Sequence, residues 1–235
     1  EKNRSWDIGF SLLKQDLWRD GDRLAFKVAW FKNDIDNAIT RRFDSSNWAF
    51  YVDNVDNYTV SGYELQSGYD AGIAYLDLSA SYYQRARTCD AATAKRLRED
   101  PYAKWSKLDT TPDCVDGGFG TSFVNAQNPP KYSIHSTLGV RLFDKRLDTG
   151  IRRTYTSGPT HELDKPWNTT GSTGLQNIYL PTAIYDFYAR WQFTPKAEVE
   201  LVVSNLRNTY YMDTLAMSLM PGPGRTTRLN FTARF

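Results

Sequence analysis

Gly224-Arg-Thr-Thr-Arg-Leu-Asn-Phe-Thr-Ala-Arg-Phe235 is the stretch of sequence that decides the fold. From Leu229 to Phe235 every second residue is apolar, and the residues from Arg228 to Arg234 that alternate with them are polar or charged. Successive side chains of a strand point to opposite faces, so the stretch predicts a strand with one apolar and one polar face. Such a strand suits the wall of a membrane barrel, and it also suits the edge of a soluble sandwich. The rest of the chain has to separate these two possibilities.

The same period-two alternation recurs eight more times along the chain. In the clearest copies Trp6, Ile8, Phe10 and Leu12 alternate with polar or small residues. The segments lie near 5–12, 23–30, 51–69, 74–83, 132–142, 146–156, 182–193 and 198–203. Patterning at this density predicts an all-β chain without a substantial helix among its main elements.

Connectors of two lengths alternate between the predicted strands. Short ones, with Asp, Gly or Pro at their tips, fall at 19–22, 69–72, 143–146 and 193–197. Long ones fall near 40–48, 87–130, 159–179 and 211–223. Outer-membrane barrels have short periplasmic turns and long extracellular loops, whereas a soluble sandwich has no reason to collect its long loops at one end. The sequence therefore favours a transmembrane antiparallel β-barrel with these four loops outside the cell.

Composition argues against several other classes of protein. The chain has 29 basic and 27 acidic residues, and this balance predicts no nucleic-acid partner. We find no nucleophile–base set, no phosphate-binding Gly-rich loop and no metal-ligand spacing, so the sequence predicts neither an enzyme nor a metal site. The 15 Tyr, 12 Phe and 7 Trp residues suit a barrel, which places aromatic side chains at both membrane interfaces.

Nine is an odd number of strands, whereas bacterial single-chain barrels have even numbers. A wall of nine strands would leave two unpaired edges in lipid, where backbone groups find no water. We therefore expect further strands outside residues 1–235, either before Glu1 or in another chain.

Two groups of motifs resemble the TonB-dependent outer-membrane receptors. Asn205-Leu-Arg-Asn-Thr-Tyr-Tyr211 is similar to the family's Asn-Leu-Phe-Asn-Lys-Tyr-Tyr element, with Arg207 in place of the usual Phe, and Pro223-Gly-Arg225 follows it as in the family. Tyr51-Val-Asp-Asn54 and Ser61-Gly-Tyr-Glu-Leu65 resemble the family's Tyr-x-Asn and Gly-x-Glu elements. Phe231 and the terminal Phe235 resemble the barrel-closing signal that is read by the insertion machinery of outer-membrane barrels.

The resemblance implies a 22-strand barrel, of which residues 1–235 would form the last nine strands. It places the protein in the bacterial outer membrane, crossing it many times and in contact with its lipid. It also implies a plug domain and a TonB box, which are not in this chain. TonB would therefore act through the plug, outside residues 1–235.

Within that family, Glu1-Lys-Asn-Arg-Ser-Trp-Asp-Ile-Gly9 resembles the end of the Asn-Pro-x-Leu-x-Pro-Glu-Lys-Ser box of receptors for haem, haemoglobin and haemophores. The large loop at 87–130 with its cysteine pair is also similar to that branch. The resemblance implies active uptake of haem as the transported ligand, delivered by a haemophore or a host haemoprotein. In such receptors an axial His lies on the loop just before this box, which would be upstream of Glu1. The alternatives are a ferric-siderophore receptor, a passive porin-like channel and a soluble adhesion sandwich.

Cys89 and Cys114 flank the loop at 90–113. If that loop is extracellular, its oxidising surroundings favour a disulfide over two free thiols or a metal pair. Closing a ring of about 26 residues would stabilise the loop by roughly 3 kcal/mol. Within this loop, Ala92-Thr-Ala-Lys-Arg-Leu-Arg-Glu-Asp100 could form a short helix.

The chain has two histidines. His161, in the loop at 159–179, is a candidate haem ligand because a neutral imidazole can bind haem iron, although loop histidines are usually only solvated. His135 is predicted to face the lumen and to hydrogen-bond to the barrel or the plug. The lumen face is also predicted to carry Lys27, Glu64, Asp77, Arg141, Asp186, Arg190, Glu198, Glu200, Arg228 and Arg234.

Overall fold

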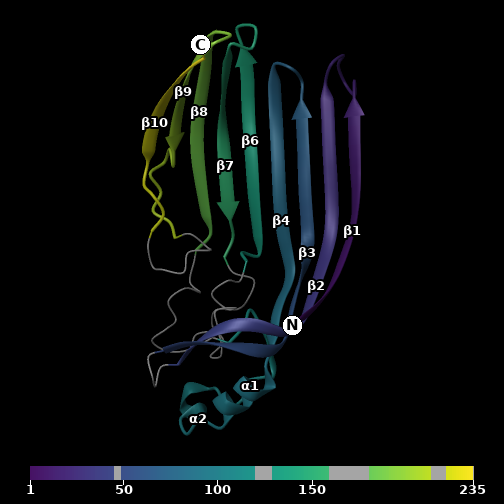
Figure 1. Ribbon diagram of the computed structural model, residues 1–235, viewed down its shortest axis with the longest axis vertical. Coiled ribbons are helices and arrows are strands. Elements are labelled where there is room, and N and C mark those ends of the chain that lie inside the picture. The colour runs from purple at the N-terminus through teal and green to yellow at the C-terminus, as the bar shows by residue number, and fades with distance from the viewer. Residues whose placement is uncertain (45–48, 120–128, 159–179, 213–220, 235) are drawn as a thin grey trace.

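The computed structural model describes residues 1–44, 49–119, 129–158, 180–212 and 221–234, and its main body is a single curved antiparallel sheet (Figure 1). Neighbouring strands follow one another in sequence order, and the short strand β5 pairs only with β4. The strands are β1 Lys2–Gln15, β2 Arg23–Asp44, β3 Ala49–Asp70, β4 Ala74–Cys89, β5 Cys114–Asp116, β6 Tyr132–Leu142, β7 Leu147–Thr156, β8 Thr182–Thr194, β9 Ala197–Ser204 and β10 Thr226–Ala233. The all-β prediction is confirmed, and the nine strands other than β5 form what we call the wall.

β2 and β3 run far beyond the end of β1, and this corrects the loop expected near 40–48. Residues 40–44 are strand and pair with 49–53, whereas 45–48 lie outside the described residues. The polar run Asn33-Asp-Ile-Asp-Asn37 interrupts the apolar alternation and therefore looks like a loop in the sequence. Ladder hydrogen bonds depend on the backbone, so the pairing continues where neither face has to be apolar.

The β2–β3 hairpin bends at Asn37. Asn37 has a φ of 53°, and the ladder has no pair between Asp36↔Asn57 and Ala38↔Val55. Asn54 Nδ2 donates a hydrogen bond of 2.6 Å to the Asn37 carbonyl oxygen and so holds the bend. Beyond this point the hairpin turns across the loop end of the wall, which is the lower end in Figure 1.

The short connectors lie together at the opposite end of the wall, which we call the turn end. In the turn between β1 and β2 the Asp22 side chain is buried and accepts hydrogen bonds from the backbone N–H groups of Leu17, Trp18 and Arg19, at 2.6, 3.0 and 3.1 Å. The Tyr69 hydroxyl donates a fourth, at 2.8 Å. Burial by itself would raise the pKa of Asp22, but these four donors favour the carboxylate, and the pKa lies below its ordinary value of 3.8.

Replacing Asp22 with asparagine is expected to loosen this turn at pH 7. An amide oxygen accepts more weakly than a carboxylate, so the amides of residues 17–19 should exchange with deuterium roughly tenfold faster. In the unmodified protein, the amides of residues 17–19 should be fully protected from exchange at pH values above the ordinary pKa of Asp22. This protection should be lost only as the pH falls through the lower pKa that Asp22 has in the folded protein. Exchange read by mass spectrometry tests this, with exposed Asp20→Asn as the control. Equal exchange in the two variants would contradict it.

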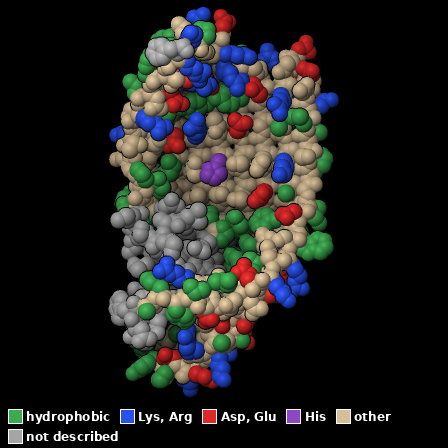
Figure 2. Space-filling model, viewed as in Figure 1, with side chains coloured by type: hydrophobic (Ala, Val, Ile, Leu, Met, Phe, Trp, Pro, Cys, Tyr) green, Lys and Arg blue, Asp and Glu red, His purple; other side chains and the backbone are tan. Residues whose placement is uncertain are grey.

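The register of the strands gives the wall two faces. Ser11, Lys27, Gln66, Ser79, His135 and Thr154 form one row across six strands. This face carries a hollow of about 560 Å³. Figure 2 shows a hollowed face on which small polar side chains and backbone predominate, with charged side chains toward the turn end. We call this the concave face.

The opposite, outward face of the wall is apolar and uncovered by other described residues. Its large side chains remain exposed, for example Ile8 at 64%, Leu138 at 61% and Leu229 at 70%. A soluble domain buries such a face against a second layer, but the described residues supply no such layer. The wall therefore has one polar and one apolar face, as the sequence predicted.

Aromatic side chains bound the apolar zone of the outward face at both ends. Toward the loop end, Trp30, Tyr63, Tyr82 and Tyr132 pair in one row across four strands, and Tyr132 stacks on Tyr155 with ring centroids 6.0 Å apart. Trp18 with Tyr69 and Phe143 with Trp191 lie at the turn end. Tyr and Trp concentrate at the two interfaces of a membrane, so these bands match the limits of a bilayer core.

Candidate functional site: loop subdomain and concave face

Residues 89–119 form a small folded unit at the loop end, which we call the loop subdomain. It contains α1 Ala91–Arg98, α2 Ala103–Ser106 and β5. Asp90 caps α1 by accepting a 2.9 Å hydrogen bond from the Thr93 N–H, and the Ala91 N–H donates to Asp56 of β3 at 2.8 Å. The helix expected near 92–100 is confirmed, and it is fixed to the bent hairpin. No helix among the residues described here is long and apolar enough to cross a membrane.

The loop subdomain has a very small apolar core. Ala94, Val115 and Phe119 are buried in contact with Leu97. Cys89 and Cys114, which pair across β4 and β5, form a disulfide. Arg98 adds an ion pair to Asp113 at 2.8 Å and a hydrogen bond to the Thr111 carbonyl oxygen at 2.6 Å. Covalent and polar links therefore supplement the small apolar cluster that the described residues form.

Two aromatic side chains project from this subdomain into solvent. Trp105 is 88% exposed on α2, and Tyr102, which caps that helix, is 73% exposed. The short helix ends at Lys107, which takes the left-handed conformation. The backbone N–H of Lys107 donates to the carbonyl oxygens of Ala103 and Lys104. Trp and Tyr are among the residue types that dominate the energy of protein interfaces.

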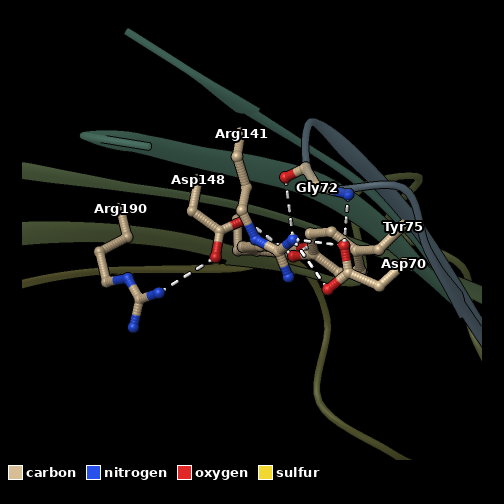
Figure 3. Close-up of polar contacts among 7 residues, drawn as sticks. Asp70, Gly72, Tyr75, Arg141, Asp148 and Arg190 are labelled. Atoms are coloured by element: carbon tan, nitrogen blue, oxygen red, sulfur yellow. Dashed lines mark hydrogen bonds and ion pairs between the residues drawn. The ribbon is translucent and has the colours of Figure 1, made fainter. Parts of the chain in front are cut away.

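On the concave face, near the turn end, charged and phenolic groups from five strands meet (Figure 3). Arg141 of β6 donates to both carboxylate oxygens of Asp70, at 2.8 and 2.9 Å, and to the Gly72 carbonyl oxygen at 3.1 Å. The Arg141 guanidinium also lies 4.3 Å from the centroid of the Tyr75 ring. Asp148 accepts from the Tyr75 hydroxyl at 2.8 Å and from Arg190 at 3.0 Å. These charges are therefore paired within the wall.

Two tyrosines cross over this part of the wall. Tyr75 of β4 and Tyr188 of β8 are hydrogen-bonded through their hydroxyl groups. They meet over Gly139 and Gly150, which are paired on the two intervening strands. A Cβ at Gly139 would lie 2.3 Å from Tyr75 Cζ and 2.7 Å from the Tyr188 hydroxyl. Only glycine leaves room for the crossing, and sequence reasoning missed this arrangement although a glycine within a strand often marks a close approach.

The predicted site residues lie in different parts of the molecule. His135 lines the hollow of the concave face, as predicted, with Nδ1 3.3 Å from Thr154 Oγ1. Glu200 lies opposite Arg190 in the ladder and accepts from Asn230 Nδ2 at 3.1 Å. Phe231 is 68% exposed on the outward face. Candidate His161, the loop at 159–179 and Phe235 lie outside the described residues. The described residues contain no cluster of three His, Cys, Asp or Glu that could hold a metal ion.

The motif segments near the end of the chain are brought together around Asn205. This side chain is only 3% exposed; Nδ2 donates to the carbonyl oxygens of Thr209 and Pro223, and Oδ1 accepts from the Thr209 N–H. Asn208 Oδ1 accepts from the Arg225 N–H at 2.9 Å. Of the loop expected at 211–223, residues 213–220 are outside the described part, and Met212 forms a bridge with Pro221. The motif thus builds the connection between β9 and β10.

Two known receptors are similar to this chain in sequence. The hemophilin receptor of Acinetobacter baumannii is 30% identical over 98% of the chain and 22% of its own length. The TonB-dependent heme receptor A of Haemophilus ducreyi is 27% identical over 77% of the chain and 21% of its own length. The chain therefore spans less than a quarter of the length of these receptors.

The fold is also that of a solved receptor. The HasR hemophore receptor of Serratia marcescens, whose structure was determined with its hemophore HasA and heme, matches 99% of this chain and 31% of its own, with a TM-score of 0.65 and 24% identity. The family model for the TonB dependent receptor-like β-barrel matches residues 1–206. Proteins of this family are receptors and transporters of the outer membrane, and this chain belongs to the TonB-dependent receptor β-barrel family.

Proposed function

We propose that this chain is part of a TonB-dependent outer-membrane receptor that takes up haem delivered by a haemophore or a host haemoprotein. The likeness to the hemophilin receptor carries this proposal, because it extends over 98% of the chain and so includes both wall and loops. The likeness to a second heme receptor supports it. The receptor binds and transports haem, and no step requires an enzyme.

In the proposed receptor, further strands pair with the edges of β1 and β10 and close the barrel. The apolar outward face contacts membrane lipid, and the loop end faces the outside of the cell. A plug outside this chain fills the lumen against the concave face and couples the receptor to TonB. Residues 1–235 supply wall, loops and partner surface.

A haem titration of the full-length receptor in detergent, followed by its Soret spectrum, tests the proposed ligand. We expect a stoichiometric endpoint and a low-spin spectrum of the bis-histidine type. The His161→Ala variant tests whether His161 is an axial ligand of the haem iron. Loss of this imidazole should change the Soret spectrum only if His161 binds the iron. No spectral change in a folded wild-type receptor would rule out haem and favour a ferric siderophore.

The haem carrier is proposed to bind the loop subdomain through Trp105 and Tyr102. Replacing Trp105 with alanine is expected to weaken binding of the haem-loaded carrier by about 30-fold, the loss typical of a hot-spot residue. Binding of free haem should not change, because no described contact links Trp105 to the concave face. Surface plasmon resonance measures the first effect and the Soret titration the second.

Trp18→Ala is the matched control, because Trp18 is 71% exposed but lies at the turn end. Equal affinities of the Trp105→Ala and Trp18→Ala variants for the carrier would place the carrier's binding surface elsewhere.

A further inference from the structure

An aromatic and basic cluster occupies the outward face of the wall where β7 and β8 approach the loop end. Arg153 of β7 is directly opposite Tyr185 of β8 in the ladder. The next pair on this face is Ile151 and Phe187, and Ile151 is 47% exposed on the apolar surface. Arg153 and Tyr185 therefore point away from the lumen, toward the membrane.

Arg207 joins this cluster from the connection between β9 and β10. Its guanidinium lies 4.4 Å from the centroid of the Tyr185 ring. The Arg153 guanidinium lies 5.1 Å from the centroid of the Tyr155 ring, which belongs to the aromatic band. The buried Asn205 fixes the turn that carries Arg207, so the position of this arginine is built into the fold. The two cations thus lie on the aromatic rings at the level of the membrane interface.

Neither guanidinium has a carboxylate within ion-pairing distance among the described residues, in contrast to four other arginines of the chain. Arg4, Arg98, Arg141 and Arg190 all have such partners, at 2.7 to 3.0 Å. The acidic side chains on the same strands face the lumen: Asp148 binds Arg190, and Asp186 accepts from the Asn205 N–H. The outward face of β7 and β8 therefore keeps a net positive charge.

A guanidinium at a membrane interface loses part of its hydration, so an anionic partner stabilises it. Its planar fork matches the oxygens of a phosphate group, and Arg is preferred over Lys for this geometry. The apolar strip below the cluster, with Ile151 and Phe187, matches acyl chains. A phosphorylated lipid provides both chemistries in one molecule.

We propose that Arg153, which lies over Tyr155, and Arg207, which lies over Tyr185, bind the phosphate group of a phosphorylated glycolipid in the outer leaflet of the membrane. The site depends on the membrane orientation given under the proposed function, but not on haem as the ligand. Bound lipid would neutralise both arginines and hold the β9–β10 connection against the wall. Arg207 stands where the motif usually has Phe.

Native mass spectrometry of the full-length receptor in detergent with added lipid A tests the site. We expect lipid A adducts on the wild type and at least a tenfold weaker apparent affinity for the Arg153→Gln/Arg207→Gln double variant. Arg152→Gln is the matched control, because Arg152 is the adjacent residue on the concave face, where it lies over Tyr188. This control should bind lipid A as the wild type does.

The remaining arms separate the sources of the binding energy. Dephosphorylated lipid A should bind the wild type and the double variant equally and weakly; strong binding to both would mean that only acyl contacts matter and would overturn the proposal. Complete displacement of lipid A by millimolar inorganic phosphate would identify a free-anion site and would also overturn the proposal. Wild-type affinity in the double variant would overturn it directly. A receptor that binds lipid A at this site but not haem would leave it intact.

Discussion

Replacing Gly139 with valine is expected to lower the amount of folded receptor in the outer membrane by at least tenfold. Even the Cβ of the new side chain would lie 2.3 Å from Tyr75 Cζ and 2.5 Å from its hydroxyl oxygen. Tyr75 cannot move aside without losing two interactions, because its hydroxyl donates a hydrogen bond to Asp148 and the Arg141 guanidinium lies over its ring. Overpacking usually costs about 1–3 kcal/mol, and here it would also break the crossing of the two tyrosines. Heat-modifiable mobility of the membrane fraction on gels measures the folded fraction.

Thr137→Val is the control, because it places valine on the same strand and the same face without the crossing above it. Adding Tyr75→Ala to Gly139→Val should restore part of the folded receptor by removing the atoms that clash. Normal assembly of the single Gly139→Val variant would contradict the packing argument. Failure of the control as well would show that the strand tolerates no substitution there.

Removing the disulfide with Cys89→Ala and Cys114→Ala is expected to open the loop subdomain and leave the wall folded. The chain-entropy model assigns roughly 3 kcal/mol to a ring of this size. That corresponds to about a 150-fold larger open population. Among the described residues, the apolar cluster that remains is Ala94, Val115 and Phe119 with Leu97, which is too small to compensate. Trypsin should then cut the folded double variant at Lys95, Arg96 or Arg98, and binding of the proposed haem carrier should be lost.

Wild-type receptor treated with a reductant should show the same cleavage pattern, whereas the oxidised wild type should resist. Heat-modifiable mobility on gels reports whether the wall is folded, and the folded fraction should be the same in every sample. If the double variant resists trypsin as well as the oxidised wild type, the polar links of Asp90 and Arg98 are sufficient to hold the subdomain.

The strands of the wall were predictable because the pattern that identifies them, alternation of apolar and polar residues, lies within each strand. One face of each strand is apolar and the other polar, so the alternation is present within each strand and needs no knowledge of its neighbours. This alternation ends where the hairpin leaves the apolar zone, and for this reason strand residues 40–44 looked like a loop.

The concave-face cluster was not predictable in the same way. Tyr75 and Tyr188 are 113 residues apart, and their meeting depends on the register of every strand between them. The only local signal was the presence of Gly139 and Gly150 within strands. Likewise, Arg207 could be recognised as a departure from its motif, but its position over Tyr185 follows from the turn around Asn205. His161 lies outside the described residues and stays a prediction.

The pairing of Arg141, Asp148 and Arg190 with partners inside the wall has a consequence for transport. A wall whose charges were neutralised by the plug would leave bare charges behind whenever the plug moved, and the electrostatic work would be added to the force that TonB must supply. Here those three side chains are already compensated when the lumen is open. In the proposed receptor this stretch of the wall would act as an electrostatically neutral track, along which a plug segment can slide without first breaking ion pairs to Arg141, Asp148 or Arg190.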